Sequence, residues 1–478
     1  MKPARPFVPR IGGRVAVVLA LALPMAPAWS VRPVTAETVH DARALRQAVR
    51  AAEPGTTIKL ASGTYELGKL KLSRSGRPDA PITLTAAERG AVVLRTGSIE
   101  MLKITGAHWH VRGLDFVGGP GSHHAVHIQG PAHGTVIAGN RFRGFHAAIK
   151  SNGQKRDGPY PHRVEISRNV FANPGPRPTD APVTPIDVVG GDDWRIVANF
   201  IADFAKGEGD RISYAAFLKG GGENGLIARN LVICEWRHSG GHRVGLSIGG
   251  GGFFFDDPRP EHHGATLVNN IVVNCPDQPA FYLNRAADVL TAFNTVYNAA
   301  GVDARFPQTG GMVADNLMTG AVLERDDASV TQAGNVTTGT RLGYYIPAAR
   351  SKLTYRISDY HIKFPNWIDA GDVAWTQRVI RSVANWLQTT RLGLGLGGFR
   401  DIVHTLPDVW LRPGDATPLV NASSGQVRTA TDFCGRSRMV PPDVGAIEYE
   451  AGPCDLRAEL TRRYGPFLPA EPLAPLAD

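Results

Sequence analysis

Short stretches of alternating apolar and polar residues, each closed by an asparagine, recur along the middle of this chain. Eight segments share the pattern: Val136-Ile-Ala-Gly-Asn140, Glu165-Ile-Ser-Arg-Asn169, Arg195-Ile-Val-Ala-Asn199, Leu226-Ile-Ala-Arg-Asn230, Thr266-Leu-Val-Asn-Asn270, Leu290-Thr-Ala-Phe-Asn294, Gly311-Met-Val-Ala-Asp-Asn316 and Thr331-Gln-Ala-Gly-Asn335. In an earlier segment, Val111-Arg-Gly-Leu-Asp115, an aspartate takes the place of the asparagine. The steps between successive asparagines are 29, 30, 31, 40, 24, 22 and 19 residues. A repeat of this length, built from short strands, indicates a stacked solenoid.

The runs between the asparagines predict strands rather than helices. Stretches such as Ala125–Gln129 and Val244–Ile248 alternate with a period of two, and clusters of Gly, Asn, Pro and Asp separate them. One coil of three strands needs about 22 residues, and coils stack at about 4.8 Å. We therefore expect an all-β fold, a right-handed parallel β-helix. Its asparagines would stack inside a turn and bond the backbone of neighbouring coils.

Residues 1–30 have the pattern of a signal peptide. Four basic residues precede the apolar stretch Val15–Leu23, and Ala26-Pro-Ala28 is a small-residue cleavage site. Nine apolar residues are too few to span a bilayer. We therefore expect no membrane span and predict export to the periplasm or the outside, with an uncleaved anchor as the alternative.

The repeats also divide the rest of the chain. We expect an N-terminal cap and first coils over residues 31–100 and the repeat body over 101–340. Residues 341–410 break the pattern, and Val373–Thr390 within them has helical spacing that suits a cover for an open coil end or an overhang beside the outer face. A closing segment over 411–450 and a Pro- and Ala-rich, loosely held tail over 451–478 complete the chain.

Both ends of this region resemble those of pectin-lyase-like β-helix proteins. Ala42–Leu67 reads as a capping helix followed by Pro-Gly-Thr-Thr-Ile-Lys-Leu and Gly-Thr-Tyr, and Asp443-Val-Gly-Ala-Ile-Glu448 resembles their closing stretch. The resemblance covers about residues 36–340 and 411–450. It implies the fold and an N-terminal capping helix, but little about activity, because one such fold hosts many functions.

The net charge of the chain indicates which class of partner it binds. The formal net charge is +9, and removal of residues 1–30, which hold four basic and no acidic residues, leaves +5. This bias favours an acidic partner. A basic tract interleaved with aromatic residues is lacking, so we do not expect nucleic acid.

Four cysteines fit an oxidising compartment. We expect Cys434 to pair with Cys454, whereas Cys234 and Cys275 are either bridged or buried thiols.

The alternation predicts which side chains face outward on one sheet. His127, Asp187, Phe217, Ser247 and Tyr282 are expected in one column, and Gln129, Lys150, Lys219 and Asn284 in a second. The longest insertion, Gly249–His263, lies beside them and follows Arg237–Arg243. We expect a sugar polymer to contact side chains of this face and of the loops: Lys150, Asp187, Phe217, Arg237, His242, Phe254 and Asn284. A packed loop without a binding role is the alternative.

These residues suit β-elimination on a uronate polymer. The reaction needs a base for the C5 proton and a cation for the adjacent carboxylate. A lysine among other cations loses affinity for its own proton and can act as the base, so Lys219 is the candidate. We expect Arg243, or else Arg237 or Lys150, to neutralise the carboxylate. Tyr282 or His127 would give a proton to the leaving oxygen.

The stretch Ala216-Phe-Leu-Lys-Gly-Gly-Gly-Glu-Asn224 resembles the lysine-bearing coil of polysaccharide lyase family 6, the alginate lyases and chondroitinase B. In that family an arginine follows one coil later and an acidic calcium ligand precedes the lysine by five residues. Those positions here are Gly249 and Tyr214. A closer resemblance is to exported β-helix proteins with Lys-Gly-Gly-x-x-Asn and a Gly-rich segment with Phe and Arg-Pro, which Gly249–Pro260 matches. The family 6 resemblance implies a polysaccharide lyase acting on an acidic polysaccharide, and we expect the protein to be a monomer.

Other chemistries remain open at this stage. Ca²⁺ is the candidate cofactor, with Asp256, Asp257 and Glu261 as oxygen ligands. Hydrolysis would use two carboxyl groups, for which Asp187, Asp192 and Asp193 are available near one coil edge. Uronate epimerisation on the same scaffold is a further alternative. A non-catalytic polysaccharide-binding or envelope-structural solenoid is the third hypothesis.

Overall fold

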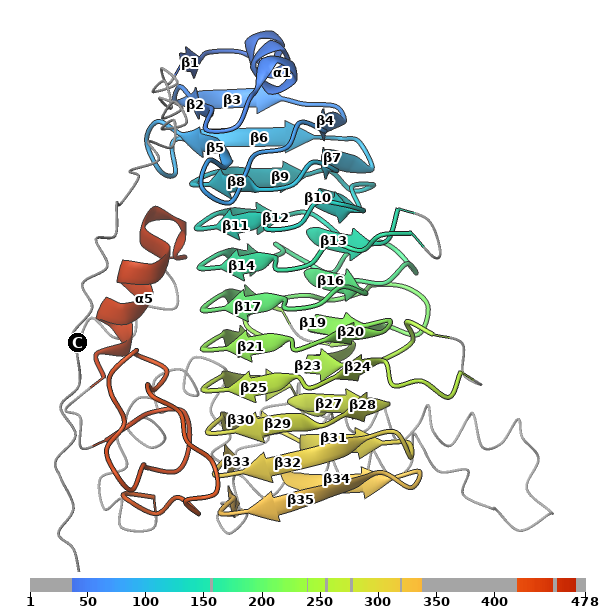
Figure 1. Cartoon of the computed structure of the whole chain (residues 1–478), viewed down its shortest axis with the longest axis vertical. Coiled ribbons are helices and arrows are strands. Elements are labelled where there is room, and N and C mark those ends of the chain that lie inside the picture. The colour runs from blue at the N-terminus through green and yellow to red at the C-terminus, as the bar shows by residue number, and fades with distance from the viewer. Residues whose placement is uncertain are drawn as a thin grey trace, which may run out of the picture. The chain divides into compact units, whose positions relative to one another are not determined.

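A computed structural model describes residues 37–154, 158–238, 240–253, 257–275, 278–318, 320–337, 419–449 and 454–469. These residues contain three long sheets whose strands all pair in parallel, one strand of each sheet per coil (Figure 1). The predicted right-handed parallel β-helix is therefore confirmed. Residues 1–36 and the predicted helix at 373–390 lie outside the described residues. No described helix has the length and apolar character needed to cross a membrane.

The strands of the three sheets follow the predicted runs. The first sheet contains β1 (Glu37–Val39), β2 (Thr57–Leu60), β5 (Ile82–Ala86), β8 (Trp109–Arg112), β11 (Val136–Ala138), β14 (Glu165–Ser167), β17 (Arg195–Val197), β21 (Leu226–Ala228), β25 (Thr266–Val268), β29 (Val289–Ala292), β32 (Gly310–Ala314) and β35 (Ser329–Ala333). The second sheet contains β3 (Gly63–Glu66), β6 (Val92–Thr96), β9 (Asp115–Gly118), β12 (Arg141–Arg143), β15 (Val170–Ala172), β18 (Phe200–Ala202), β22 (Leu231–Ile233), β26 (Ile271–Cys275), β30 (Thr295–Ala299), β33 (Leu317–Met318) and β36 (Val336–Thr337). The third sheet contains β4 (Leu70–Leu72), β7 (Glu100–Ile104), β10 (His124–Gln129), β13 (Ile149–Asn152), β16 (Ile186–Val189), β19 (Ile212–Lys219), β23 (His242–Ile248), β27 (Phe281–Asn284), β31 (Gly301–Arg305) and β34 (Ala321–Arg325). A small sheet joins β20 (Gly222–Glu223), β24 (His262–His263) and β28 (Ala286–Ala287).

The helix α1 (Ala42–Ala51) lies at the start of the stack, where the sequence predicts a cap (Figure 1). Oδ1 of Asp41 accepts from the backbone N–H groups of Arg43 and Ala44, each at 2.8 Å, and so satisfies two free donors of the first turn. Leu45 and Val49, one turn apart, are buried in the main hydrophobic core. The apolar stripe of the helix therefore covers the interior of the first coil.

The predicted asparagine ladder runs between the first and second sheets. The pattern is the same at each step: Oδ1 of Asn230 accepts from the backbone N–H and from Nδ2 of Asn199, at 2.9 and 3.0 Å. Nδ2 of Asn230 donates to the carbonyl of Ile196 at 2.8 Å. All eight predicted asparagines take part. Their side chains form hydrogen bonds with backbone N–H and C=O groups of the turns, which the strand pairing leaves without partners.

Asp115 does not continue this ladder, contrary to the sequence expectation. Oδ1 of Asn140 accepts from the N–H of Leu114 at 3.0 Å, so Leu114 occupies the ladder position. Asp115 starts β9 one residue later, where its carboxylate is buried and pairs with Arg141 at 2.6 Å and Arg143 at 2.8 Å. A charged group at this position is retained because two guanidinium groups compensate it.

The strap, which we define as residues 419–449 and 454–469, lies along the outer face of the second sheet (Figure 1). It contains α5 (Leu456–Tyr464) and the 3₁₀ turn η2 (Gly465–Phe467). Phe433 and Tyr464 of the strap join Phe200 and Leu231 of the sheet in one buried cluster. The expectation of a loosely held tail after residue 450 is therefore wrong for residues 454–469. The outer face of the second sheet is apolar and needs a cover.

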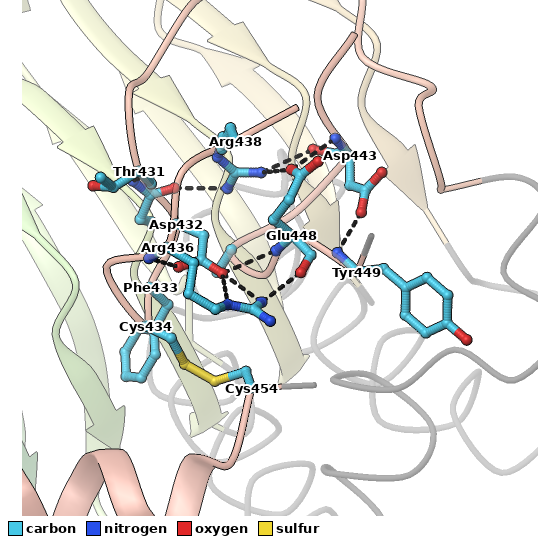
Figure 2. A network of polar contacts seen from close by, with 12 residues as sticks. Thr431, Asp432, Phe433, Cys434, Arg436, Arg438, Asp443, Glu448, Tyr449 and Cys454 are labelled. Atoms are coloured by element: carbon cyan, nitrogen blue, oxygen red, sulfur yellow. Dashed lines mark hydrogen bonds and ion pairs between the residues drawn. A yellow bond between two sulfur atoms is a disulfide. The ribbon is translucent and has the colours of Figure 1, made fainter. Parts of the chain in front are cut away.

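Buried ion pairs fix the strap internally (Figure 2). Arg438 and Glu448 pair at 3.0 Å with almost no exposure of either side chain. Arg438 also donates to Oδ1 of Asn269 at 2.8 Å, which connects the strap to a turn of the β-helix. Disulfides join Cys434 to Cys454, the expected pairing, and Cys234 to Cys275, which settles that alternative in favour of a bridge.

Candidate functional site

The outer face of the third sheet carries the predicted chemistry. Strand pairing places the following residues in one column: His127, Lys150, Asp187, Phe217, Ser247 and Tyr282. Lys150 therefore belongs to the first column, and its expected place in the second is wrong. Asn152 stands beside Gln129 instead, because β13 continues two residues past Lys150. The other predicted column members lie where the alternation placed them.

Lys219 ends β19 on this face. Its Nζ lies 3.8 Å from the centroid of the Phe217 ring. Among the described residues, no acceptor forms a hydrogen bond or ion pair with this amine. Burial lowers the pKa of Lys219, and the charge of Lys150 lowers it further, while Asp187 and Glu261 oppose this shift. A partly desolvated amine without a counter-ion is a suitable general base.

The glycines after Lys219 fix the end of this strand. Gly220 has φ +76°, and a Cβ there would lie 2.7 Å from Cγ1 of Val189 on the preceding coil. The N–H of Gly220 donates to Oε2 of Glu261 at 2.9 Å, and that of Gly221 donates to the Glu261 carbonyl at 2.8 Å. The Lys-Gly-Gly sequence is therefore a tight turn that holds Lys219 against the insertion loop.

Glu261 anchors the insertion loop and is not placed as a calcium ligand. Its carboxylate is buried, accepts from the N–H groups of Gly252 and Phe253 at 2.8–2.9 Å, and pairs with Arg285 at 2.6 Å. These donors occupy both oxygens. The sequence proposed Glu261 because acidic residues cluster there. The structure shows that the Glu261 carboxylate instead accepts hydrogen bonds from backbone amides of the loop.

Asp257, the other predicted metal ligand among the described residues, does not complete a site with Glu261. Asp257 pairs with Arg259 at 2.7 Å, and the hydrogen bonds from Arg259 hold the pKa of Asp257 at about 2. Asp256 and the predicted sugar contact Phe254 lie outside the described residues. Within the described part of the chain, no group of three or more His, Cys, Asp or Glu side chains is arranged to hold a metal ion.

Tyr214 occupies the position at which the resembled family has an acidic calcium ligand. Its ring packs edge-on against Phe217, with 5.5 Å between centroids, and burial raises the pKa of its hydroxyl. A neutral, buried phenol supplies no carboxylate to a hard cation. The described residues therefore do not fit that calcium site.

Arg243 does not complete the site of Lys219, contrary to the sequence expectation. It is almost wholly buried and donates to the carbonyls of Cys234 at 2.6 Å and Gly240 at 2.9 Å. Pairing of β19 with β23 sets Lys219 level with Gly249, six residues after Arg243. Six strand residues span about 20 Å. Arg243 therefore stabilises the turn that follows Cys234.

Arg237 and His242 also have other partners. Arg237 pairs with the buried Asp203 at 2.7 Å and donates to the carbonyl of Asn173 at 3.0 Å. His242 lies at the start of β23, where its Nδ1 contacts Nε2 of Gln278 at 3.1 Å. Arg237 therefore stabilises a turn through these contacts. It does not supply the free cation for a sugar carboxylate that the sequence analysis expected.

Gly249 excludes the arginine that follows one coil later in the resembled family. It has φ +80°, and a Cβ built on it would lie only 1.9 Å from the carbonyl oxygen of Asn284. Real Cβ atoms do not approach backbone this closely, so no other residue fits without movement of the chain. A cation for a substrate carboxylate would have to come from another position.

Tyr282 and His127, the two predicted proton donors, lie on opposite sides of Lys219 along the stack. Tyr282 is two coils beyond Phe217, about 10 Å away, and its hydroxyl accepts from Nδ2 of Asn284 at 2.8 Å. Burial raises the pKa of Tyr282, which keeps the phenol protonated. His127 is three coils away and contacts Glu100 at 2.6 Å. Tyr282 is the nearer donor.

Sequence reasoning missed the contact between Lys150 and Asp187. Nζ of Lys150 lies 2.7 Å from Oδ2 of Asp187, and both side chains are largely buried. The alternation predicts that both side chains face outward, but only the strand pairing shows that Lys150 stands directly beside Asp187. The pair lies next to Lys219 on the same face.

A comparison with known protein families agrees with the expected resemblance. Residues 39–179 match the family model of chondroitinase B, which confirms that resemblance for this part of the chain. No curated protein matches the sequence. The matched stretch ends before Lys219, so it does not test the site.

Solved structures of polysaccharide lyases are similar to this chain at low identity. The pectate lyase Pel9A has 14% identity and a TM-score of 0.44 over 62% of this chain and 76% of that one. An alginate lyase from Paenibacillus sp. str. FPU-7 has 18% identity and a TM-score of 0.34 over 62% and 98%. A mannuronic acid specific family 6 lyase from human gut microbiota has 13% identity and a TM-score of 0.34 over 74% and 99%.

Proposed function

We propose that this protein is a polysaccharide lyase that cleaves an acidic, uronate-containing polysaccharide by β-elimination. The observation that carries the proposal is Lys219, a largely buried amine on an outward sheet face with no counter-ion among the described residues. The family 6 resemblance of its sequence and the chondroitinase B match of residues 39–179 support the same class of reaction.

The reaction follows from the chemistry of the two groups. Lys219 removes the proton at C5 of a uronate, and the electrons form a double bond between C4 and C5 as the bond from C4 to the bridging oxygen breaks. The leaving oxygen takes a proton, for which Tyr282 is the nearer of the two candidates. A protonated phenol, kept so by its burial, suits this role.

Export is part of the proposal. The signal-peptide pattern of residues 1–30 would bring the protein to the periplasm or the outside, where large acidic polysaccharides are found. Fractionation of cells that express the full chain tests this. Retention in the cytoplasm without processing would contradict it.

The experiment uses residues 31–478 with alginate, pectate and glycosaminoglycans, each with and without Ca²⁺. Newly formed unsaturated uronate ends absorb in the ultraviolet, and we expect this absorbance to rise for one polymer. Lys219→Ala should abolish the rise, whereas Lys71→Ala, an exposed lysine near the start of the same sheet, should not. New reducing ends without absorbance would indicate a hydrolase. Neither signal, with polymer binding retained, would indicate a binding protein.

A further inference from the structure

An ion pair beside Lys219 has one oxygen without a donor. Lys150 on β13 and Asp187 on β16 are direct neighbours, and Nζ lies 2.7 Å from Oδ2. The side chain of Asp187 is only 8% exposed, yet its Oδ1 has no hydrogen-bond partner among the residues that the structure describes. A buried carboxylate oxygen normally has a donor, since leaving it unpaired is costly. We infer that the missing donor is supplied by a bound ligand, which reaches Oδ1 only after the Asp187 carboxylate turns toward the outer face, because Oδ1 is closed to solvent in this conformation.

Lys150 retains capacity for a second anion. An ammonium group has three N–H donors, and Asp187 accounts for one. The side chain is 19% exposed, so Nζ can be approached from solvent. Lys150 and Lys219 stand on the same face two coils apart, about 10 Å, so one bound oligosaccharide can contact both amines.

Among the described residues, Arg243 and Arg237, the other two cations that the sequence proposes, have partners of their own. Gly249 leaves no room for an arginine one coil later, and Arg243 lies about 20 Å along the strand direction. Tyr214 replaces the acidic calcium ligand of the resembled family. Of the three cations that the sequence proposes, Lys150 is thus the one that lies on the same face as the base.

We propose that Lys150 and Asp187 form a uronate subsite that works without a metal ion. The ammonium group of Lys150 binds the sugar carboxylate, and Oδ1 of Asp187 accepts a hydrogen bond from a sugar hydroxyl. This inference rests on the proposed lyase function. It places the neutralising cation two coils before the base, whereas the resembled family has it one coil after.

Binding to short oligosaccharides tests the subsite separately from turnover. The probes are trimers of galacturonate and of mannuronate, each as the free acid and as the methyl ester, titrated calorimetrically in the presence of EDTA. The variants are Lys150→Gln and Asp187→Ala, with Lys71→Gln as the matched control. Thermal unfolding of each variant reports whether it is folded.

We expect wild type to bind one free acid more tightly than its ester. Lys150→Gln should weaken binding of the acid by about 10- to 100-fold, the usual size of a charge-assisted hydrogen bond, and leave the ester unaffected. Asp187→Ala should weaken both, because the hydroxyl contact is common to acid and ester. Lys71→Gln should change neither.

Three results would overturn the subsite: equal loss on acid and ester for Lys150→Gln, a loss no larger than that of Lys71→Gln, or binding abolished by EDTA. Failure of the lyase proposal looks different. In that case acid trimers bind through Lys150 while no polymer yields unsaturated ends.

Discussion

Asn230→Ala tests whether the asparagine ladder supports the β-helix. Asn230 is wholly buried in the middle of the stack. Its Oδ1 accepts from the N–H and Nδ2 of Asn199, and its Nδ2 donates to the carbonyl of Ile196 and to Oδ1 of Asn270, all at 2.8–3.0 Å. Alanine removes all four hydrogen bonds at once.

The cost follows from the groups left behind. The backbone N–H of Asn199 loses its acceptor and the carbonyl of Ile196 loses this donor, in a turn without access to solvent. Each buried unsatisfied group costs about 1–3 kcal/mol, so we expect a loss of about 3–5 kcal/mol in the free energy of unfolding. Asn335→Ala is the control, because Asn335 makes similar contacts to Asn316 but is only half-buried. Water can replace its amide, and about 1 kcal/mol should be lost.

Urea-induced unfolding, followed by circular dichroism and by tryptophan fluorescence, measures both changes. A shift of the midpoint at constant m-value reports stability. The ladder argument is refuted if Asn230→Ala costs less than about 1 kcal/mol. It is equally refuted if Asn230→Ala costs no more than Asn335→Ala.

Three further predictions concern the site and the strap. Lys219→Ala should reduce kcat/KM by about 10²- to 10⁴-fold. The amine must lose its proton to act as a base, and its pKa is lowered, so wild-type activity should rise with pH and level off below pH 10.5. A profile that falls with pH would contradict the role of a base. Gly249→Ala should lower the free energy of unfolding by about 3 kcal/mol, measured by thermal unfolding. Gly121→Ala, with open space around it, should change it by no more than about 0.5 kcal/mol. Equal effects of the two substitutions would refute the steric argument. Arg438→Met should lower the free energy of unfolding by about 3–5 kcal/mol, because it leaves Glu448 buried and uncompensated. Limited proteolysis of this variant should then cut the strap first. An unchanged cleavage pattern would argue against a role of Arg438 in docking the strap.

Errors in the sequence reading of the site have two physical causes. Lys150 was assigned to the wrong column and Asp115 to the ladder, because the relation between coils depends on turn lengths that alternation within one strand does not fix. Arg243 and Glu261 were expected in the site because charged residues usually face solvent. Both are buried, since carbonyl and amide groups of their own loops satisfy their charges.

The strap shows what a chain-local pattern cannot reveal. Arg463 donates to the carbonyl of Arg229, more than two hundred residues earlier, and Tyr464 donates to that of Ala198. No periodicity within residues 454–469 indicates which sheet face they cover. Only docking against the outer residues of the second sheet determines it.

The sequence by itself determined the β-helix, its asparagine ladder, its capping helix and the outward position of Lys219. Alternation within each strand and the recurring asparagines predict the coils, the ladder and the outward Lys219. The capping helix was implied by the resemblance of Ala42–Leu67 to the entry of pectin-lyase-like β-helix proteins. The tertiary structure decided which charges meet. It placed Lys150 beside Asp187, excluded an arginine at Gly249 and left Lys219 without a counter-ion among the described residues, because these relations join different coils whose register is set by packing of the whole stack.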